Sequence, residues 1–152
     1  MKKPRILVVS ASNALKYVMK HFPAPGLTET PDKTDTYAVI SIQDTICGGF
    51  GFELRKNRYC KDVLTVYFDD IEKPEYGLRL ISIPQAIAIT KFIKAHVEDV
   101  DTLLIHCFAG VSRSRAVGVF AREVLQIPPA DENDYNEYVY ATLKKVWKEL
   151  KE

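Results

Sequence analysis

The stretch Leu103–Ala116, L-L-I-H-C-F-A-G-V-S-R-S-R-A, is the most informative part of this chain. An apolar run leads directly into His106 and Cys107, a short loop follows, and Arg113 stands where a helical pattern begins. A loop between a strand and a helix can point successive backbone N–H groups into a small concavity, and the helix N-terminus adds positive potential there. The stretch therefore predicts a strand–loop–helix unit that binds an anion such as a phosphate group.

The same surroundings would activate the cysteine. Only a thiolate attacks efficiently, and N–H donors, a helix N-terminus and a guanidinium group all stabilise a thiolate. We therefore predict that Cys107 is a nucleophile and that Arg113 holds two phosphoryl oxygens through its planar fork. Ser114 is expected to donate a hydrogen bond to the sulfur, and His106 to orient the loop through the backbone without transferring a proton. The segment predicted to surround the phosphate is Phe108, Ala109, Gly110, Val111, Ser112 and Arg113.

The segment from His106 to Ser114 resembles the H-C-x-x-G-x-x-R-[S/T] signature of the protein tyrosine phosphatase superfamily. Its A-G-x-S-R-S wording is most similar to the small dual-specificity branch. The resemblance implies a phosphatase that works through a cysteinyl-phosphate intermediate. The competing interpretation, a buried core cysteine followed by a surface arginine, does not explain why a strand and a helix flank the motif.

A general acid is also implied, because a serine, threonine or tyrosine leaving group departs with a proton. Members of the family usually supply an aspartate from a loop upstream of the cysteine. Here the apolar run Val63–Phe68 ends at Asp69 and Asp70, and strand ends of this kind face the ligand side of a parallel sheet. We favour Asp70 as the acid and keep Asp69 as the alternative. The Trp-Pro-Asp form of the acid loop is missing, which favours the dual-specificity branch.

The order of apolar patterns predicts the fold. Strands are expected at Arg5–Ser10, Thr36–Gln43, Val63–Phe68 and Thr102–Phe108. Helical spacing is found over Asn13–His21, Ile83–Val97, Ser114–Leu125 and Tyr135–Leu150. Strands that alternate with helices predict a three-layer α/β sandwich with a mainly parallel central sheet, of the protein tyrosine phosphatase-like type, in a single domain over residues 1–152.

Two loops stand out, Phe22–Asp35 and Asp44–Asp62. The second contains Gly48-Gly49-Phe50-Gly51, which lacks the spacing of a dinucleotide-binding fingerprint and is interpreted as a flexible surface loop. It also contains Lys56-Asn57-Arg58-Tyr59, which matches the phosphotyrosine loop of large tyrosine-specific phosphatases. That loop lies far upstream in those enzymes, so we treat the match as coincidence, with Arg58 or Tyr59 at most lining the edge of the cleft.

Composition excludes several classes. A formal net charge of +1 gives no global footprint for nucleic acid, and no apolar run has the length of a membrane span. Three cysteines do not form a disulfide framework, which favours the cytoplasm, and neither Cys47 nor Cys60 has an arginine six residues later. The three histidines are scattered, so we expect no metal and no cofactor.

We expect the substrate to be a phosphorylated protein or peptide, with phosphotyrosine first and phosphoserine and phosphothreonine as further candidates. A phosphoinositide or an RNA 5′ phosphate is the alternative. Phosphatases for such polyanionic substrates often carry extra Lys or Arg in this loop, but the residues between Cys107 and Arg113 carry no charge, which disfavours that alternative. A catalytically inactive phosphate-binding module is the third candidate. The sequence carries no signal for an oligomeric state.

Overall fold

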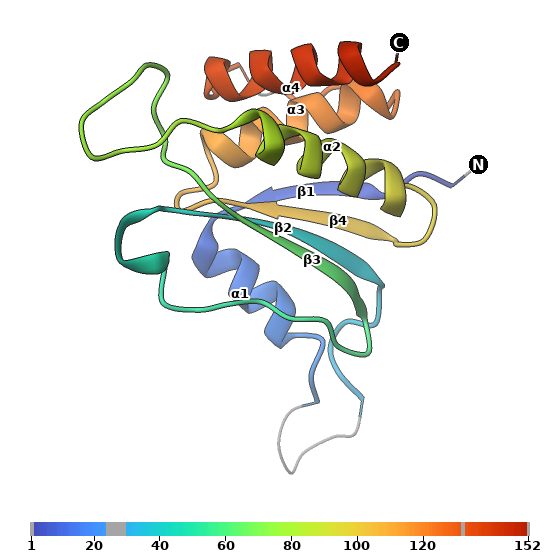
Figure 1. Ribbon diagram of the computed structural model, residues 1–152. Coiled ribbons are helices and arrows are strands. Elements are labelled where there is room, and N and C mark those ends of the chain that lie inside the picture. Colours follow the sequence, from blue (N-terminus) through green and yellow to red (C-terminus); the bar gives the residue numbers. More distant parts are fainter. Residues whose placement is uncertain (1, 24–29, 132, 152) are drawn as a thin grey trace.

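The computed structural model describes residues 2–23, 30–131 and 133–151, and within these residues it contains a single sheet of four parallel strands (Figure 1). The strand order is β1-β4-β2-β3. The strands are β1 (Arg5–Val9), β2 (Tyr37–Gln43), β3 (Cys60–Tyr67) and β4 (Thr102–His106). The predicted parallel sheet is therefore confirmed. Part of the loop Phe22–Asp35, residues 24–29, lies outside the described residues.

Four helices cover the two faces of this sheet unequally in the part of the chain that is described (Figure 1). Helix α1 (Ala11–Met19) lies on one face, and α2 (Ile83–His96) and α3 (Arg113–Val124) lie on the other. Helix α4 (Glu137–Lys151) packs on α2 and α3, away from the sheet. The predicted sandwich is confirmed, and α4 adds a further layer on one side.

Strand β2 shows how the two faces differ. All its residues are buried, because it lies between β4 and β3 with helices or loops on both faces. Ala38, Ile40 and Ile42 join the larger apolar core under α2 and α3. On the α1 face, Tyr37 and Val39 join a smaller core, but the same face continues with two buried polar residues, Ser41 and Gln43.

The loop that follows β2 closes this second face. Gly48 and Gly51 are exposed, as the predicted surface loop requires, whereas Leu54 is buried and Phe52 packs against the smaller core. Gly49 adopts φ 109°, and a Cβ there would approach Oε1 of Gln43 to 2.3 Å. Only glycine fits this position, because a side chain would be strained and would displace Gln43.

The Lys56–Tyr59 segment lies at the end of the sheet where the strands begin. Nδ2 of Asn57 donates to the hydroxyl of Tyr37, the first residue of β2, and the Tyr59 ring lies 5.7 Å from that of His21. Cys107 follows the last residue of β4, at the opposite end. Arg58 and Tyr59 therefore do not line the cleft beside Cys107, and the match to a phosphotyrosine loop is not supported by position.

Candidate active site

The loop that follows β4 surrounds the sulfur of Cys107 with donors. Strand β4 ends at His106, one residue before the cysteine, so Cys107 belongs to the loop and not to the strand that the sequence predicted up to Phe108. The backbone N–H of Gly110 donates to Sγ at 3.2 Å, and Oγ of Ser114 lies 3.1 Å from it. Helix α3 begins at Arg113 and directs its N-terminus toward the same sulfur.

These contacts change the acidity of the thiol. Burial of Cys107 raises its pKa, but the hydrogen bonds from Ser114 and Gly110, together with the charge of Arg113, outweigh burial and lower the pKa below its usual value. Cys60 is the contrast, since burial dominates there and raises its pKa to about 11. Among the cysteines whose side chains are described, only Cys107 therefore has a pKa shifted toward the thiolate; the side chain of Cys47 lies outside that description.

Two carbonyl groups hold the loop in place. The carbonyl of Cys107 lies 3.0 Å from Nδ1 of His106, and the carbonyl of Phe108 accepts from the backbone N–H of Ala11 at 3.0 Å. A peptide unit is planar, with its N–H opposite its C=O. The N–H groups of Phe108 and Ala109 therefore point away from His106 and Ala11, which bind these carbonyls.

Gly110 is needed for the loop to lie this close to β1 and α1. Its φ is 77°, and a Cβ would come within 2.5 Å of the backbone N of Ser10 and the backbone C of Val9. A larger residue would therefore push the loop away from the start of α1. The neighbouring Phe108 and Val111 are exposed at 64% and 50%, so the rim of the loop is apolar.

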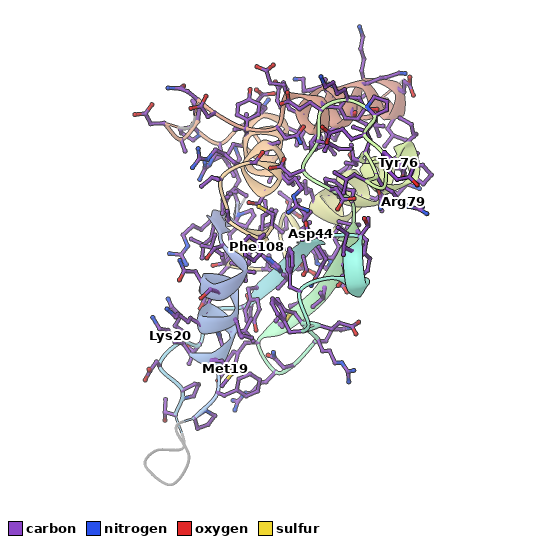
Figure 2. All side chains as sticks on the ribbon, turned by 90° about the vertical axis from the view of Figure 1, so that its left-hand side faces the viewer. Met19, Lys20, Asp44, Tyr76, Arg79 and Phe108 are labelled. Atoms are coloured by element: carbon purple, nitrogen blue, oxygen red, sulfur yellow. The ribbon has the colours of Figure 1, made fainter. Side chains whose placement is uncertain are left out.

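The guanidinium of Arg113 is buried and anchored at one nitrogen. Its Nη1 donates to the carbonyl of Phe68 at 2.7 Å and forms an ion pair with Oδ1 of Asp44 at 2.8 Å. Its Nε is buried and has no partner among the described residues. An anion bound in the loop would supply an acceptor for this donor. Figure 2 looks onto this end of the sheet and shows Phe108 and Asp44 on the same face.

The two aspartates at the end of β3 have different surroundings. Asp69 is buried and accepts from the backbone N–H and the hydroxyl of Thr45, at 3.1 and 2.5 Å, and from the backbone N–H of Arg79 at 2.8 Å. Burial raises the pKa of Asp69, but these hydrogen bonds and the charge of Arg113 outweigh it and lower the pKa. Asp69 thus joins the loops that follow β2 and β3.

Asp70 reaches the loop that follows β4 instead. Its Oδ1 accepts from the hydroxyl of Ser112 at 2.7 Å and from Nδ2 of Asn136 at 2.9 Å. Asp70 and Ser112 also line an open cleft of about 650 Å³, together with residues of the segment that follows β3. The structure thus brings Asp70 next to the loop of Cys107 and turns Asp69 toward Thr45 and Arg79.

Sequence reasoning missed Asp44 and Asn136. Asp44 directly follows β2, and the carboxyl ends of parallel strands meet at one edge, so its position was a usable signal. Asn136 is buried and precedes α4, where its Oδ1 accepts from the N–H of Val139 as a helix cap. Nothing in the sequence links a cap of α4 to Asp70, because the contact spans 66 positions.

No metal cluster and no membrane-spanning helix is found in the described part of the chain. Residues 2–23, 30–131 and 133–151 contain no group of three or more His, Cys, Asp or Glu side chains that could hold a metal ion. None of the helices described there combines the length and the apolar character that crossing a bilayer requires.

Comparison with known proteins identifies the fold. No protein-family model matches the chain, and no curated protein sequence matches it significantly. The crystal structure of Tk-PTP in the active form superposes with a TM-score of 0.50 at 19% identity, over 97% of this chain and 93% of that one. The chain has the fold of a protein tyrosine phosphatase. The tyrosine phosphatase OH1 from the Orf virus gives a TM-score of 0.46 at 13% identity, over 99% of this chain and 78% of that one.

Proposed function

We propose that this protein hydrolyses phosphomonoesters of proteins, phosphotyrosine first, through a cysteinyl-phosphate intermediate on Cys107. The observation that carries the proposal is the thiol of Cys107, which is buried and yet has a lowered pKa because Ser114, Gly110 and Arg113 all stabilise its anion. A buried cysteine without a function would show the opposite shift, as Cys60 does. The likeness to Tk-PTP in fold supports the same activity.

In the first step the Cys107 thiolate attacks the phosphorus atom. The S–P bond forms while the P–O bond to the substrate breaks, and the proton of the Asp70 carboxyl group passes to the departing oxygen. The N–H groups of Phe108 and Ala109 and the free edge of Arg113 take up the charge on the phosphoryl oxygens. Nη1 of Arg113 keeps its hydrogen bond to the carbonyl of Phe68, which fixes the orientation of the guanidinium group.

In the second step water attacks the phosphorus atom of the intermediate. The Asp70 carboxylate takes a proton from the water, the S–P bond breaks, and the sulfur leaves as a thiolate. A thiolate can only accept a hydrogen bond, so the hydroxyl of Ser114 donates to it and makes it a better leaving group. Inorganic phosphate is released and the cysteine is restored.

The contacts of the two aspartates support Asp70 as the acid. A general acid must carry a proton and reach the leaving oxygen. Asp69 accepts three hydrogen bonds from Thr45 and Arg79 and has a lowered pKa, which favours its carboxylate form. Asp70 lies on the cleft beside Ser112, where a substrate oxygen would emerge from the loop.

The rim of the site supports a protein substrate over a polyanionic lipid or RNA. Phe108 and Val111 are exposed and apolar, and the segment that lines the neighbouring cleft carries the acidic Asp70, Glu72 and Glu75 against a single Lys73. An acidic rim repels substrates that carry several phosphate groups. A phosphorylated side chain on a polypeptide carries one.

The experiment is a substrate panel with matched cysteine variants. Purified protein is offered phosphotyrosine, phosphoserine and phosphothreonine peptides, a phosphoinositide and a 5′-phosphorylated RNA, and released phosphate is measured. Turnover should be greatest on phosphotyrosine. It should be lost in Cys107→Ser, because the serine hydroxyl stays protonated and attacks poorly, and it should persist in Cys60→Ser. Full activity in a folded Cys107→Ser protein would refute the nucleophile; preference for the lipid or RNA would refute the substrate class.

A further inference from the structure

A chain of buried hydrogen bonds leads from the loop after β2 to the carbonyl of Cys107. Ser41, Gln43 and His106 are exposed by 1% or less. Ser41 and His106 are direct neighbours in the register of β2 and β4, and their side chains meet at 2.6 Å between Oγ and Nε2. Buried polar groups in a sheet of apolar strands are costly unless each one is paired, so their presence needs a reason.

The orientation of the Gln43 amide is determined by two backbone groups. The N–H of Phe50 can only donate, and it lies 2.7 Å from Oε1 of Gln43. The carbonyl of Phe52 can only accept, and it lies 3.2 Å from Nε2. Nε2 therefore carries the two protons of the amide, and the second one is donated to Oγ of Ser41 at 3.2 Å.

This orientation determines the direction of the bonds that follow. Since Oγ of Ser41 already accepts from Gln43, its hydroxyl proton is available for Nε2 of His106. The carbonyl of Cys107 can only accept, so Nδ1 of His106 must carry the ring proton that it donates there at 3.0 Å. His106 is then a neutral ring protonated on Nδ1. Burial and the charge of Arg113 lower the pKa of His106, in agreement with this state.

We propose that Gln43 and Ser41 are positioning residues for Cys107, which hold His106 in the Nδ1–H tautomer and so tie the loop after β2 to the phosphate-binding loop. The carbonyl of Cys107 is held outward by this bond, and the N–H of Phe108 is thereby directed toward the bound anion. The proposal rests on the proposed function for its kinetic consequences, but its structural content holds without turnover.

Phe50 and Phe52 show that the tie reaches the rim of the site. The Phe52 ring stacks on His106 at 5.8 Å between centroids, and the Phe50 ring lies 5.5 Å from that of Phe108. Loss of the Gln43 amide would free both backbone contacts of this loop at once. The loop after β2 would then no longer be held in a defined position relative to the segment after β4.

The first test is the ¹⁵N spectrum of the His106 ring in the unmodified protein near neutral pH. The proposal requires a neutral ring with its proton on Nδ1, and the chemical shifts of the two ring nitrogens distinguish this tautomer from the others. A proton on Nε2, alone or in addition to Nδ1, would overturn it. This measurement needs no substitution and no substrate.

The second test measures the anion site directly in Ser41→Ala, in Gln43→Met and in the double variant. The affinity for inorganic phosphate, measured by calorimetry, and the rate at which iodoacetate alkylates Cys107 should each fall by about tenfold in each single variant, because buried polar partners are left unpaired. The double variant should bind phosphate and react with iodoacetate no less well than the more impaired single variant, since both substitutions break the same chain of hydrogen bonds. Ser41→Thr, which keeps the hydroxyl, should retain most of the binding.

Ser82→Ala is the matched control, because it removes one serine hydrogen bond at the start of α2 and lies in no part of the chain of bonds. It should lower the melting temperature without changing phosphate binding or alkylation. Equal effects of Ser82→Ala and Ser41→Ala, or additive effects of the two single variants, would overturn the proposal. If the unmodified protein bound phosphate but hydrolysed no ester, the proposed function would fail, while both tests would still decide the positioning role.

Discussion

The two ends of the sheet each hold a partly buried polar cluster, and the clusters differ in what they leave unpaired. Where the strands begin, Asp35 accepts hydrogen bonds from Tyr17, from Nε2 of His21 at 2.8 Å and from Thr102 at 2.9 Å. Nδ1 of His21 lies 2.8 Å from the carbonyl of Tyr17, so both ring nitrogens are also paired. In this cluster every carboxylate and imidazole group has its partners inside the protein.

Where the strands end, the guanidinium of Arg113 keeps a buried donor without a partner among the described residues. The sulfur of Cys107 lies within hydrogen-bond distance of Oγ of Ser114 and the N–H of Gly110, and Nε of Arg113 is buried and has no partner among the described residues. Unpaired buried donors cost free energy in the empty protein and are satisfied by an anion. The comparison teaches that the first cluster pairs its groups within the protein, whereas the second leaves a donor that the anion of the proposed function would satisfy.

Arg113→Lys should have the largest effect on this contrast. Lysine keeps the charge but removes the planar pair of donors, so turnover of an aryl phosphate should fall about a thousandfold. Arg115→Lys, two positions along the same helix and bonded to the carbonyl of Asp134, is the control and should stay close to the unmodified rate. Steady-state kinetics on both variants decides the matter; near-normal turnover in Arg113→Lys would mean that the guanidinium is no clamp.

The two described cysteines should differ in alkylation. The pKa of Cys107 lies below the usual 9.0 and that of Cys60 at about 11, so the thiolate fraction of Cys107 should exceed that of Cys60 by more than about a hundredfold at mildly acidic pH. Mass spectrometry after brief exposure to iodoacetate measures the ratio. Phosphate or vanadate should protect Cys107 alone. Equal labelling of Cys60, or no protection, would contradict the anion site.

Asp70→Asn should slow turnover by an amount that depends on the leaving group. An alkyl phosphate, whose alkoxide needs a proton, should lose about a hundredfold, and an aryl phosphate with an acidic phenol far less.

Asp69→Asn is the matched control for the acid. It removes a carboxylate that joins two loops, so we expect a lower melting temperature and no dependence on the leaving group. If the leaving-group dependence followed Asp69 instead, the assignment within the pair would be reversed.

Asp35→Asn should have the smallest effect on catalysis and a clear effect on stability. Breaking the cluster should cost about 2 kcal/mol of unfolding free energy and leave turnover within about twofold. Asp99→Asn, at an exposed ion pair with His96, is the control and should cost less than about 1 kcal/mol. Urea unfolding and steady-state rates measure both. A loss of catalysis in a folded Asp35→Asn protein would contradict the claim that the cluster around Asp35 serves stability alone.

The same carboxylate predicts a pH dependence of stability. Burial raises the pKa of Asp35, but the hydrogen bonds from Tyr17, Thr102 and His21 outweigh burial and leave the pKa below the usual 3.8. A lowered pKa in the folded state stabilises the protein above the unfolded value, and this contribution is lost as the pH falls through the folded pKa. As the pH falls from about 5 to 2, the free energy of unfolding should therefore decline more steeply in the unmodified protein than in Asp35→Asn.

The fold was accessible from sequence because its signals are local. Alternating apolar runs and helical patterns predicted all four strands and all four α-helices of the described residues to within a few positions, but not the short 3-10 helix Ile46–Gly48. The boundaries moved where packing competes with local preference: the strand predicted to Phe108 ends at His106, because the loop turns to meet α1 and α3. Local pattern cannot show where a chain leaves a sheet to contact another element.

Position in sequence also explains which residues of the candidate site were found. Cys107, Arg113 and Ser114 lie within one short segment, so a strand–loop–helix unit brings them together whatever surrounds it. Asp69 and Asp70 could be found as a pair at a strand end, but local pattern could not rank them. Their difference comes from Thr45, Arg79 and Asn136, which belong to other segments.

The sequence by itself therefore determined the kind of fold and which residues make up the candidate loop after β4, because hydrophobic periodicity and the spacing of a single motif are local properties. Only the tertiary structure decided which carboxylate pairs with Arg113, which aspartate faces the cleft, and that Gln43 and Ser41 stand behind His106. Those contacts join residues that are far apart in the chain, and they follow from the parallel alignment of the strands, which brings the ends of β2, β3 and β4 to one edge.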